Sequence, residues 1–167
     1  MSDDVIFAVR LSSAIGCGLM AGLFFAFSVA VMRALSRLPA AVGMAAMQSI
    51  NVAILNPVFL AGFLGTALSC LVVLVSSLSR WHEAGAVFFV VGAALYLVGA
   101  CLITIVFNVP MNEALASTAP ADPDGGGRWA SYLTNWTAWN HVRTLAALAA
   151  AIVLTLALCR TDVIAPR

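Results

Sequence analysis

The chain has 167 residues, of which 63% are hydrophobic and only 9% are charged, and its formal net charge is +1. Soluble domains carry charge on about a quarter of their residues, so this composition indicates an integral membrane protein. The sequence has no basic patch, and we expect no nucleic acid partner.

Four apolar segments are long enough to cross a membrane, because a hydrocarbon core of about 30 Å needs about 20 helical residues. The predicted spans are residues 5–32, 57–79, 84–109 and 141–159. The predicted fold class is therefore all-α: a single membrane domain, residues 1–167, folded as a four-helix bundle. The acidic start Ser2-Asp3-Asp4 is not typical of a cleaved signal peptide.

The connection between the first two spans contains a long uncharged stretch that one span cannot absorb. Asn56-Pro57 divides it, since Asn is a good helix N-cap and Pro is favoured at the first helical position. Residues 40–55 are then predicted to form a short interfacial helix between spans one and two. The alternative is one long helix kinked at Pro57.

The third and fourth spans are separated by the longest polar stretch of the sequence. Pro110 is expected to kink or end the third span, and a polar loop is predicted over residues 113–128. A helix should restart near Trp129 and continue into the fourth span. Aromatic residues at helical spacing then form a stripe typical of a membrane interface: Trp129, Tyr132, Trp136 and Trp139.

The sequence does not fix the orientation, because its eight basic residues are all Arg and divide four and four between the two membrane faces. The long loop after the third span favours both termini inside. The expected location is a bacterial cytoplasmic (inner) membrane, with lipid as a partner. The four cysteines lie in apolar segments and are predicted to be small buried hydrophobes.

Glycines at regular spacing indicate close helix packing. Gly18 and Gly22 form one such pair, and a second series has a seven-residue spacing: Gly85, Gly92 and Gly99. The Gly18/Gly22 face could also serve a homo-oligomer.

Polar residues converge at one end of the predicted bundle, where spans one and three end and spans two and four begin. This set comprises Gln48, Asn51, Asn56, Asn108, Asn112, Asn140, His141 and Arg143. An Arg at mid-bilayer costs roughly 2.5–3.5 kcal/mol, so such residues usually face the inside of a bundle. A pocket lined by carboxamides, an imidazole and the indoles of Trp136 and Trp139 suits a planar aromatic or quinone-like molecule.

Each of these residues also has a purely structural interpretation. Asn56 can cap a helix, and the aromatic stripe can anchor the chain at the interface. Arg143 can extend to the headgroups or pair with Glu113. Gln48 and Asn51 can join helices by hydrogen bonds, and His141 can be a structural histidine.

The two histidines, His82 and His141, are predicted at opposite membrane faces, so one protomer cannot build a two-histidine metal or haem site. A haem with His141 and either Met44 or Met47 as its axial ligands is an alternative that the sequence leaves open. Otherwise no cofactor and no metal are expected from the sequence.

Several segments in chain order resemble the anthrone oxygenase-like family of small four-span membrane proteins. They are Ala21-Gly-Leu-Phe-Phe-Ala-Phe-Ser28, Gln48-Ser-Ile-Asn51, Asn56-Pro57, Asn108-Val-Pro-Met-Asn112 and Trp136-Thr-Ala-Trp-Asn-His-Val-Arg-Thr144. The resemblance implies oxidation of an anthrone-like or phenolic substrate with dioxygen, without a flavin or haem.

On this hypothesis His141 is the base that removes a substrate proton, because imidazole titrates near neutrality. Arg143, Asn140 and Asn112 would stabilise the enolate oxygen. The aromatic rings would lie between Trp136, Trp139 and Phe25. Gln48, Asn51 and Asn108 complete the predicted binding site. The alternative is a non-catalytic bundle that binds a lipid or quinone, or an accessory subunit of a membrane complex.

Overall fold

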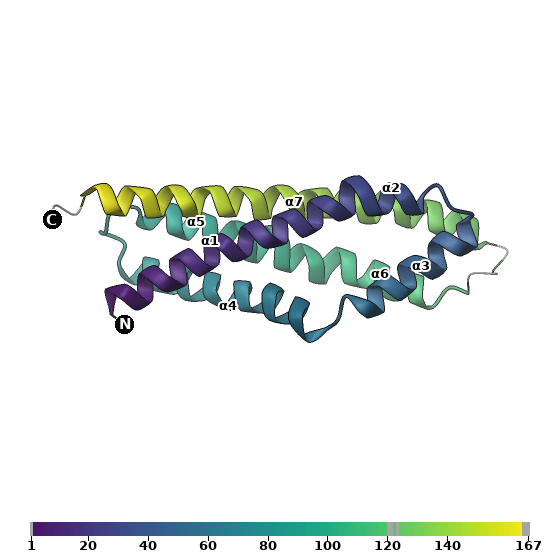
Figure 1. Cartoon of the computed structure of the whole chain (residues 1–167), viewed down its shortest axis with the longest axis horizontal. Coiled ribbons are helices and arrows are strands. Elements are labelled where there is room, and N and C mark those ends of the chain that lie inside the picture. The colour runs from purple at the N-terminus through teal and green to yellow at the C-terminus, as the bar shows by residue number, and fades with distance from the viewer. Residues whose placement is uncertain (1, 120–121, 123, 165–167) are drawn as a thin grey trace.

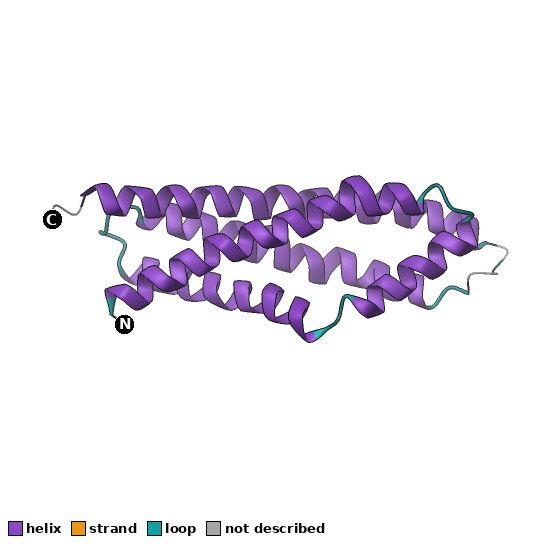
Figure 2. Cartoon of the chain, in the orientation of Figure 1, coloured by secondary structure: helices purple, strands orange, loops and turns teal. Residues whose placement is uncertain are grey.

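The computed structural model describes residues 2–119, 122 and 124–164, with side chains described up to residue 160. Within these residues all regular secondary structure is helical (Figure 2). Four long helical segments lie side by side as an elongated bundle (Figure 1). Each is long and apolar enough to cross a membrane, so the predicted all-α, four-helix membrane fold is confirmed.

The first span is one continuous helix built from α1 (Asp3–Ala26), the π-helical segment η1 (Phe27–Val31) and α2 (Met32–Leu35). The second span is α4 (Pro57–Ser79). The third runs through α5 (Ala86–Tyr96), two π-helical segments, η2 (Leu97–Leu102) and η3 (Thr104–Asn108), and α6 (Val109–Ala116). The fourth is α7 (Gly125–Ile164).

A separate helix, α3 (Ala40–Ala53), lies between the first and second spans. The Asn56 side chain accepts a hydrogen bond from the Phe59 backbone N–H at 3.0 Å, and Pro57 occupies the first helical position of α4. The prediction of a short helix here and of an Asn56 cap is confirmed. The alternative of one long kinked helix is wrong, because the chain leaves helical geometry between Ala53 and Pro57.

The third span continues past Pro110 and ends only at Ala116, contrary to the prediction that it ends near residue 109. Proline normally clashes with the carbonyl one turn earlier. Here η3 precedes it, and the Val109 N–H donates to the Thr104 carbonyl, a wider turn than in an α-helix. The predicted loop 113–128 is shorter than expected for the same reason, and because α7 already begins at Gly125.

The fourth span is the longest element, with 40 residues, which corresponds to about 60 Å of helix. It packs along α1 and α5, and α1 also packs against α4. Gly99 lies against Ala146 and Gly92 against Leu154, so these two glycines allow α5–η2 to approach α7 closely. Gly85 instead takes a left-handed conformation in the turn before α5 (φ 83°).

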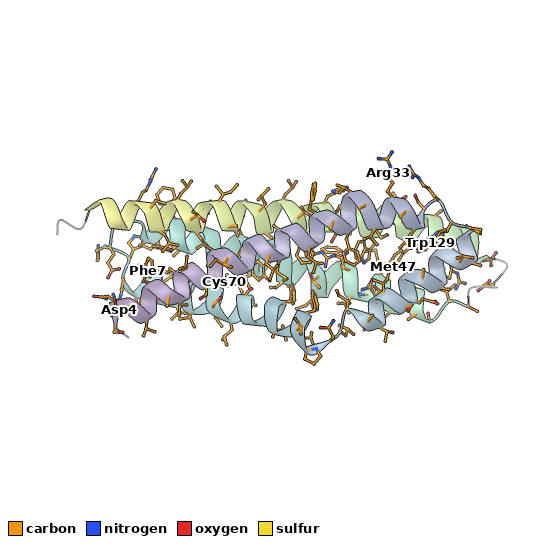
Figure 3. All side chains as sticks on the ribbon, in the orientation of Figure 1. Asp4, Phe7, Arg33, Met47, Cys70 and Trp129 are labelled. Carbon is orange, nitrogen blue, oxygen red and sulfur yellow. The ribbon has the colours of Figure 1, made fainter. Side chains whose placement is uncertain are left out.

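Two hydrophobic clusters follow each other along the bundle. The first lies within the apolar part of the spans and includes Cys70 and Tyr96, whereas the second joins α2, α3, α6 and the start of α7 and includes Met47 and Trp129. Figure 3 shows Cys70 well separated from Met47 and Trp129 along the long axis. Of the four cysteines, Cys17 and Cys70 are fully buried as predicted, with sulfurs 3.8 Å apart, whereas Cys159 is exposed.

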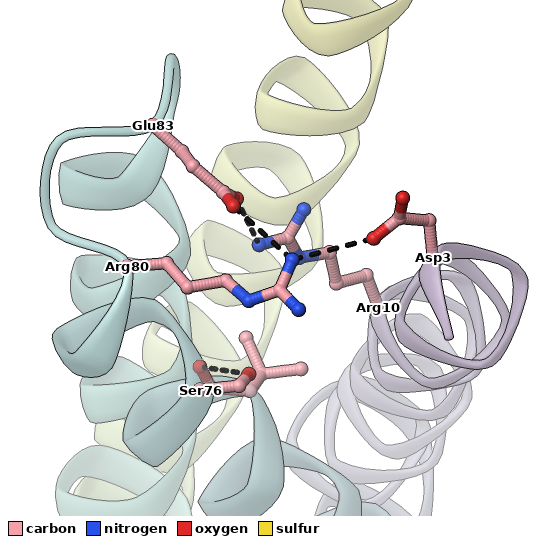
Figure 4. Close-up of polar contacts among 6 residues, drawn as sticks. Asp3, Arg10, Ser76, Arg80 and Glu83 are labelled. Atoms are coloured by element: carbon pink, nitrogen blue, oxygen red, sulfur yellow. Dashed lines mark hydrogen bonds and ion pairs between the residues drawn. The ribbon is translucent and has the colours of Figure 1, made fainter. Parts of the chain in front are cut away.

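Charged residues gather at the end of the bundle that holds the first residues of α1 (Figure 4). Arg80 contacts Asp3 at 3.3 Å and Glu83 at 3.1 Å, and Arg10 contacts Glu83 at 3.6 Å. The Arg10 guanidinium also lies 4.0 Å from the centre of the Phe89 ring. Such a charged cluster is expected at a membrane surface. The polar residues predicted from the sequence as a site lie toward the other end of the bundle.

Candidate functional site

A layer of polar side chains separates the two hydrophobic clusters, and Asn140 of α7 is at its centre. Asn140 is fully buried, and its Nδ2 donates to the Phe24 carbonyl and to Ser28 Oγ, both at 2.7 Å. Its Oδ1 accepts a hydrogen bond from the Arg143 guanidinium. One side chain therefore ties the first span to the fourth and orients the arginine.

Arg143 is only 6% exposed, yet it forms no ion pair with any described residue. Its Nη1 donates to Thr104 Oγ1 at 3.1 Å, and its guanidinium lies 4.5 Å from the Phe24 ring centre and 5.2 Å from that of Trp136. The suggested pairing with Glu113 is wrong, and the side chain does not extend to the headgroups. A buried cation held by neutral partners and aromatic faces keeps most of its charge uncompensated.

The second half of the layer comes from the third span. Asn112 Oδ1 accepts hydrogen bonds from the Tyr132 hydroxyl and from Trp136 Nε1, both at 2.8 Å. Asn108 Nδ2 donates to the Trp136 carbonyl at 3.3 Å. These bonds fix the Trp136 indole beside the guanidinium.

Three polar atoms of this layer are buried and have no hydrogen-bond partner among the described residues: Arg143 Nε, Asn51 Nδ2 and Asn108 Oδ1. Leaving such a group unsatisfied costs about 1–3 kcal/mol each. Native proteins keep few of them, and each calls for an explanation, such as a water, an ion or a ligand that it binds. Elsewhere in the described chain, Arg10 Nε and Ser77 Oγ are also buried without a partner, so the distinguishing feature here is that three such atoms belong to one layer.

The three side chains that carry these atoms line one cavity of about 100 Å³. Its polar wall also contains Thr104, Asn112, Trp136 and Asn140, and its apolar wall comprises Leu23, Phe24, Phe27, Ile50, Ile54, Leu55, Phe59 and Val109. The cavity thus combines two donors, one acceptor, a cation and aromatic faces. That combination can bind a planar molecule carrying a carbonyl or enolate oxygen.

Not every predicted site residue reaches this cavity. Asn51, Asn108, Asn112, Trp136, Asn140 and Arg143 line it. His141 is exposed and lines a separate groove with Ser28, Arg33 and Thr137. The structure therefore does not bring His141 together with Asn140 and Arg143 in one cavity, although the three are nearly adjacent in sequence.

Three other predicted residues also lie outside the cavity. Phe25 is 56% exposed on the outer face of α1. Gln48 donates to the carbonyls of Leu115 and Thr118 at 2.8 and 2.9 Å, which joins α3 to the end of α6. Trp139 stacks on Phe107, with ring centres 3.6 Å apart.

Sequence reasoning missed Phe24, Ser28 and Thr104. Phe24 takes the place expected for Phe25, and Ser28 and Thr104 are the hydroxyl partners of Asn140 and Arg143. Ser28 and Thr104 both lie in π-helical segments, which are frequent at functional sites. The signal that could have found Phe24 is its spacing from other inward residues of α1, such as Cys17, Met20 and Ala21.

The methionines suggested as haem ligands differ from His141 in burial. Met44 and Met47 are fully buried in the second hydrophobic cluster, whereas His141 is exposed in its groove. In the described part of the chain, no three His, Cys, Asp or Glu side chains gather as they would around a metal ion.

The fold and the cavity define a small multi-pass membrane protein with a buried, polar, cationic site inside its helical bundle. The chain matches the family model described as anthrone oxygenase over residues 53–153, and so it belongs to the anthrone oxygenase family. The matched range contains Thr104, Asn108, Asn112, Trp136, Asn140 and Arg143. No curated protein and no solved structure matches the chain.

Proposed function

We propose that this protein is a membrane-embedded oxygenase that oxidises an anthrone-like or phenolic substrate with dioxygen, using Arg143 to stabilise the substrate enolate. Family membership supports an oxygenase-like role. The single observation that carries the proposal is a buried guanidinium that has no described counter-ion and lines a cavity, and whose Nε has no described partner.

The proposed chemistry needs only the substrate and dioxygen. Loss of a proton from the CH₂ beside the ring ketone gives an enolate, whose oxygen accepts hydrogen bonds from Arg143 Nε and Asn51 Nδ2. The enolate carbon adds to dioxygen, and protonation gives a hydroperoxide. Loss of water from the hydroperoxide forms the second ketone, so one dioxygen is consumed and one water is released for each quinone formed.

The charge of Arg143 favours the enolate over the neutral ketone, because an uncompensated cation in a dry site stabilises a nearby anion strongly. Asn140 positions the guanidinium by accepting its Nη2–H. Trp136 and Phe24 flank the guanidinium and offer ring faces to an aromatic substrate.

His141 was predicted as the base, but it lies in a different groove. The proposal therefore assigns enolate stabilisation to Arg143 and gives the substrate proton to water at the polar end of the bundle. If Arg143 stabilises the enolate and water takes the proton, the His141 variant keeps its activity. If His141 is the base, the His141 variant loses it.

The test is oxygen uptake by detergent-purified protein supplied with a simple anthrone. We expect Arg143→Gln to lower the rate by about 10²–10³-fold, the usual effect of removing one group that stabilises an oxyanion. His141→Ala should keep a rate near that of the wild type. Helical content and elution volume of each variant show whether it is folded.

A wild-type rate in folded Arg143→Gln would overturn the proposed role of Arg143. Loss of activity in His141→Ala alone would restore the histidine as base. No uptake by the wild type, together with binding of the anthraquinone product, would leave a non-catalytic ligand-binding bundle.

A further inference from the structure

The cavity has a buried floor and an exposed mouth. Its polar lining residues Asn108, Asn140 and Arg143 are at most 6% exposed. Two of its apolar lining residues lie instead on the outer surface of the bundle: Leu55 is 64% exposed and Val109 is 38% exposed. The cavity therefore runs from the Arg143 layer to an opening between the α3–α4 connection and the start of α6.

The mouth lies at the edge of the hydrocarbon core. Pro57, the first residue of α4, is about 34 Å along that helix from the charged cluster near Arg80. Arg143 is about 25 Å along α7 from Arg160. Since the core is about 30 Å thick, the floor lies inside it and the mouth lies at its boundary with the headgroups.

The exposed surface around the mouth is mainly apolar, and Asn56 in the α3–α4 connection is its exposed polar residue. Val52 and Val58, on either side of the α3–α4 connection, are 76% and 83% exposed, and Ile105 in η3 is 63% exposed. In a membrane these side chains contact lipid rather than water. An apolar molecule dissolved in the bilayer therefore has access to this opening.

The cavity is too small to enclose a fused three-ring molecule. Its volume of about 100 Å³ is room for a few water molecules, whereas the pockets that enclose drug-sized ligands measure roughly 300–1,000 Å³. Only the polar edge of such a ligand can reach Arg143 and Asn108, and its opposite edge must extend through the mouth.

We propose that the site takes membrane-dissolved aromatic substrates laterally from the bilayer, oxygen-bearing edge first, and accepts long alkyl substituents that remain in lipid between Leu55 and Val109. This inference deepens the proposed function and rests on it, because the bound molecule is a substrate only if the protein is an oxygenase. The chain length of the substituent does not limit binding, whereas bulk at the mouth does.

Two stable anthraquinones test this without turnover: one with a 2-ethyl group and one with a 2-dodecyl group. Each is added at equal mole fraction to protein in phosphatidylcholine nanodiscs, and binding is followed by quenching of tryptophan fluorescence. We expect both to bind with similar affinity. The variant Leu55→Phe/Val109→Phe should weaken the binding of both probes by about tenfold or more, because the two larger rings narrow the mouth.

Leu64→Phe is the matched control. Leu64, on α4, is exposed as Leu55 and Val109 are, but it does not line the cavity. It should leave binding unchanged. Loss of dodecyl binding with retained ethyl binding would overturn lateral entry, because it indicates an enclosed site. Unchanged binding in the folded double variant would overturn the assigned mouth.

Failure of the proposed function gives a different pattern. If no anthrone supports oxygen uptake but both probes bind and the double variant weakens them, lateral entry stands and only the oxygenase proposal fails.

Discussion

Replacing Asn140 with Ala tests whether the polar layer holds the bundle together. The substitution removes two donated hydrogen bonds, to Phe24 and Ser28, and one accepted from Arg143. The first two bonds join α7 to the first span, whereas the third lies within α7. Hydrogen bonds between membrane helices contribute about 0.6–1.7 kcal/mol each, so the two interhelical bonds together should lower the free energy of unfolding by about 1–3 kcal/mol. Ser28→Ala removes only one of them and should cost about 0.6–1.7 kcal/mol.

The assay is equilibrium unfolding in mixed micelles by SDS titration, followed by circular dichroism. Thr155→Ala is the control, because its hydroxyl bonds only to the Ala151 carbonyl of its own helix on an exposed face, and it should change stability by less than about 0.5 kcal/mol. If Asn140→Ala cost no more than Ser28→Ala, the bonds to the Phe24 carbonyl and from Arg143 would contribute nothing, and the reasoning would be refuted.

Three further predictions concern other parts of the molecule. Gly99→Ala should lose about 1–3 kcal/mol in the same titration because a Cβ there meets Ala146, whereas Gly65→Ala, with open space around it, should lose nothing; equal effects would contradict the packing described. Trp136→Phe should weaken anthraquinone binding, since it removes the indole held by Asn112, while Trp139→Phe should not. Weaker binding in Trp139→Phe than in Trp136→Phe would place the ligand on the outer face of α7. Glu83→Gln should lower the free energy of unfolding by only about 0–1 kcal/mol, because Glu83 is half exposed. The titration is repeated at low and high salt, and a loss well above this value would mean that water screens the charged cluster less than its exposure indicates.

The number of spans, the interfacial helix and the Asn56 cap could be predicted because each depends on local sequence. Apolar length sets a span, and Asn-Pro sets a helix start. The continuation of the third span past Pro110 could not be predicted this way. It depends on π-helical turns in η3, and the preceding sequence, Thr-Ile-Val-Phe-Asn, gives no rule for them.

Choosing between Asn140 and His141 required the whole length of α7. The two residues differ by about 100° around the helix, and both are polar. The buried residues further along α7, Ala147, Ala150, Leu154 and Ala157, continue the stripe of Trp136, Asn140 and Arg143 at three- and four-residue steps. A sequence argument extended to these small residues would have placed Asn140 inside and His141 outside.

The polar layer also constrains how the chain assembles in the membrane. Asn140 and Arg143 belong to α7, which is synthesised after the helices that carry their partners Phe24, Ser28 and Thr104. Until α7 docks, its arginine faces lipid or headgroups without these partners, an expensive arrangement for an inserted helix. The polar layer can therefore form only when α7 docks, and that one helix contributes both the Asn140 and the Arg143 contacts.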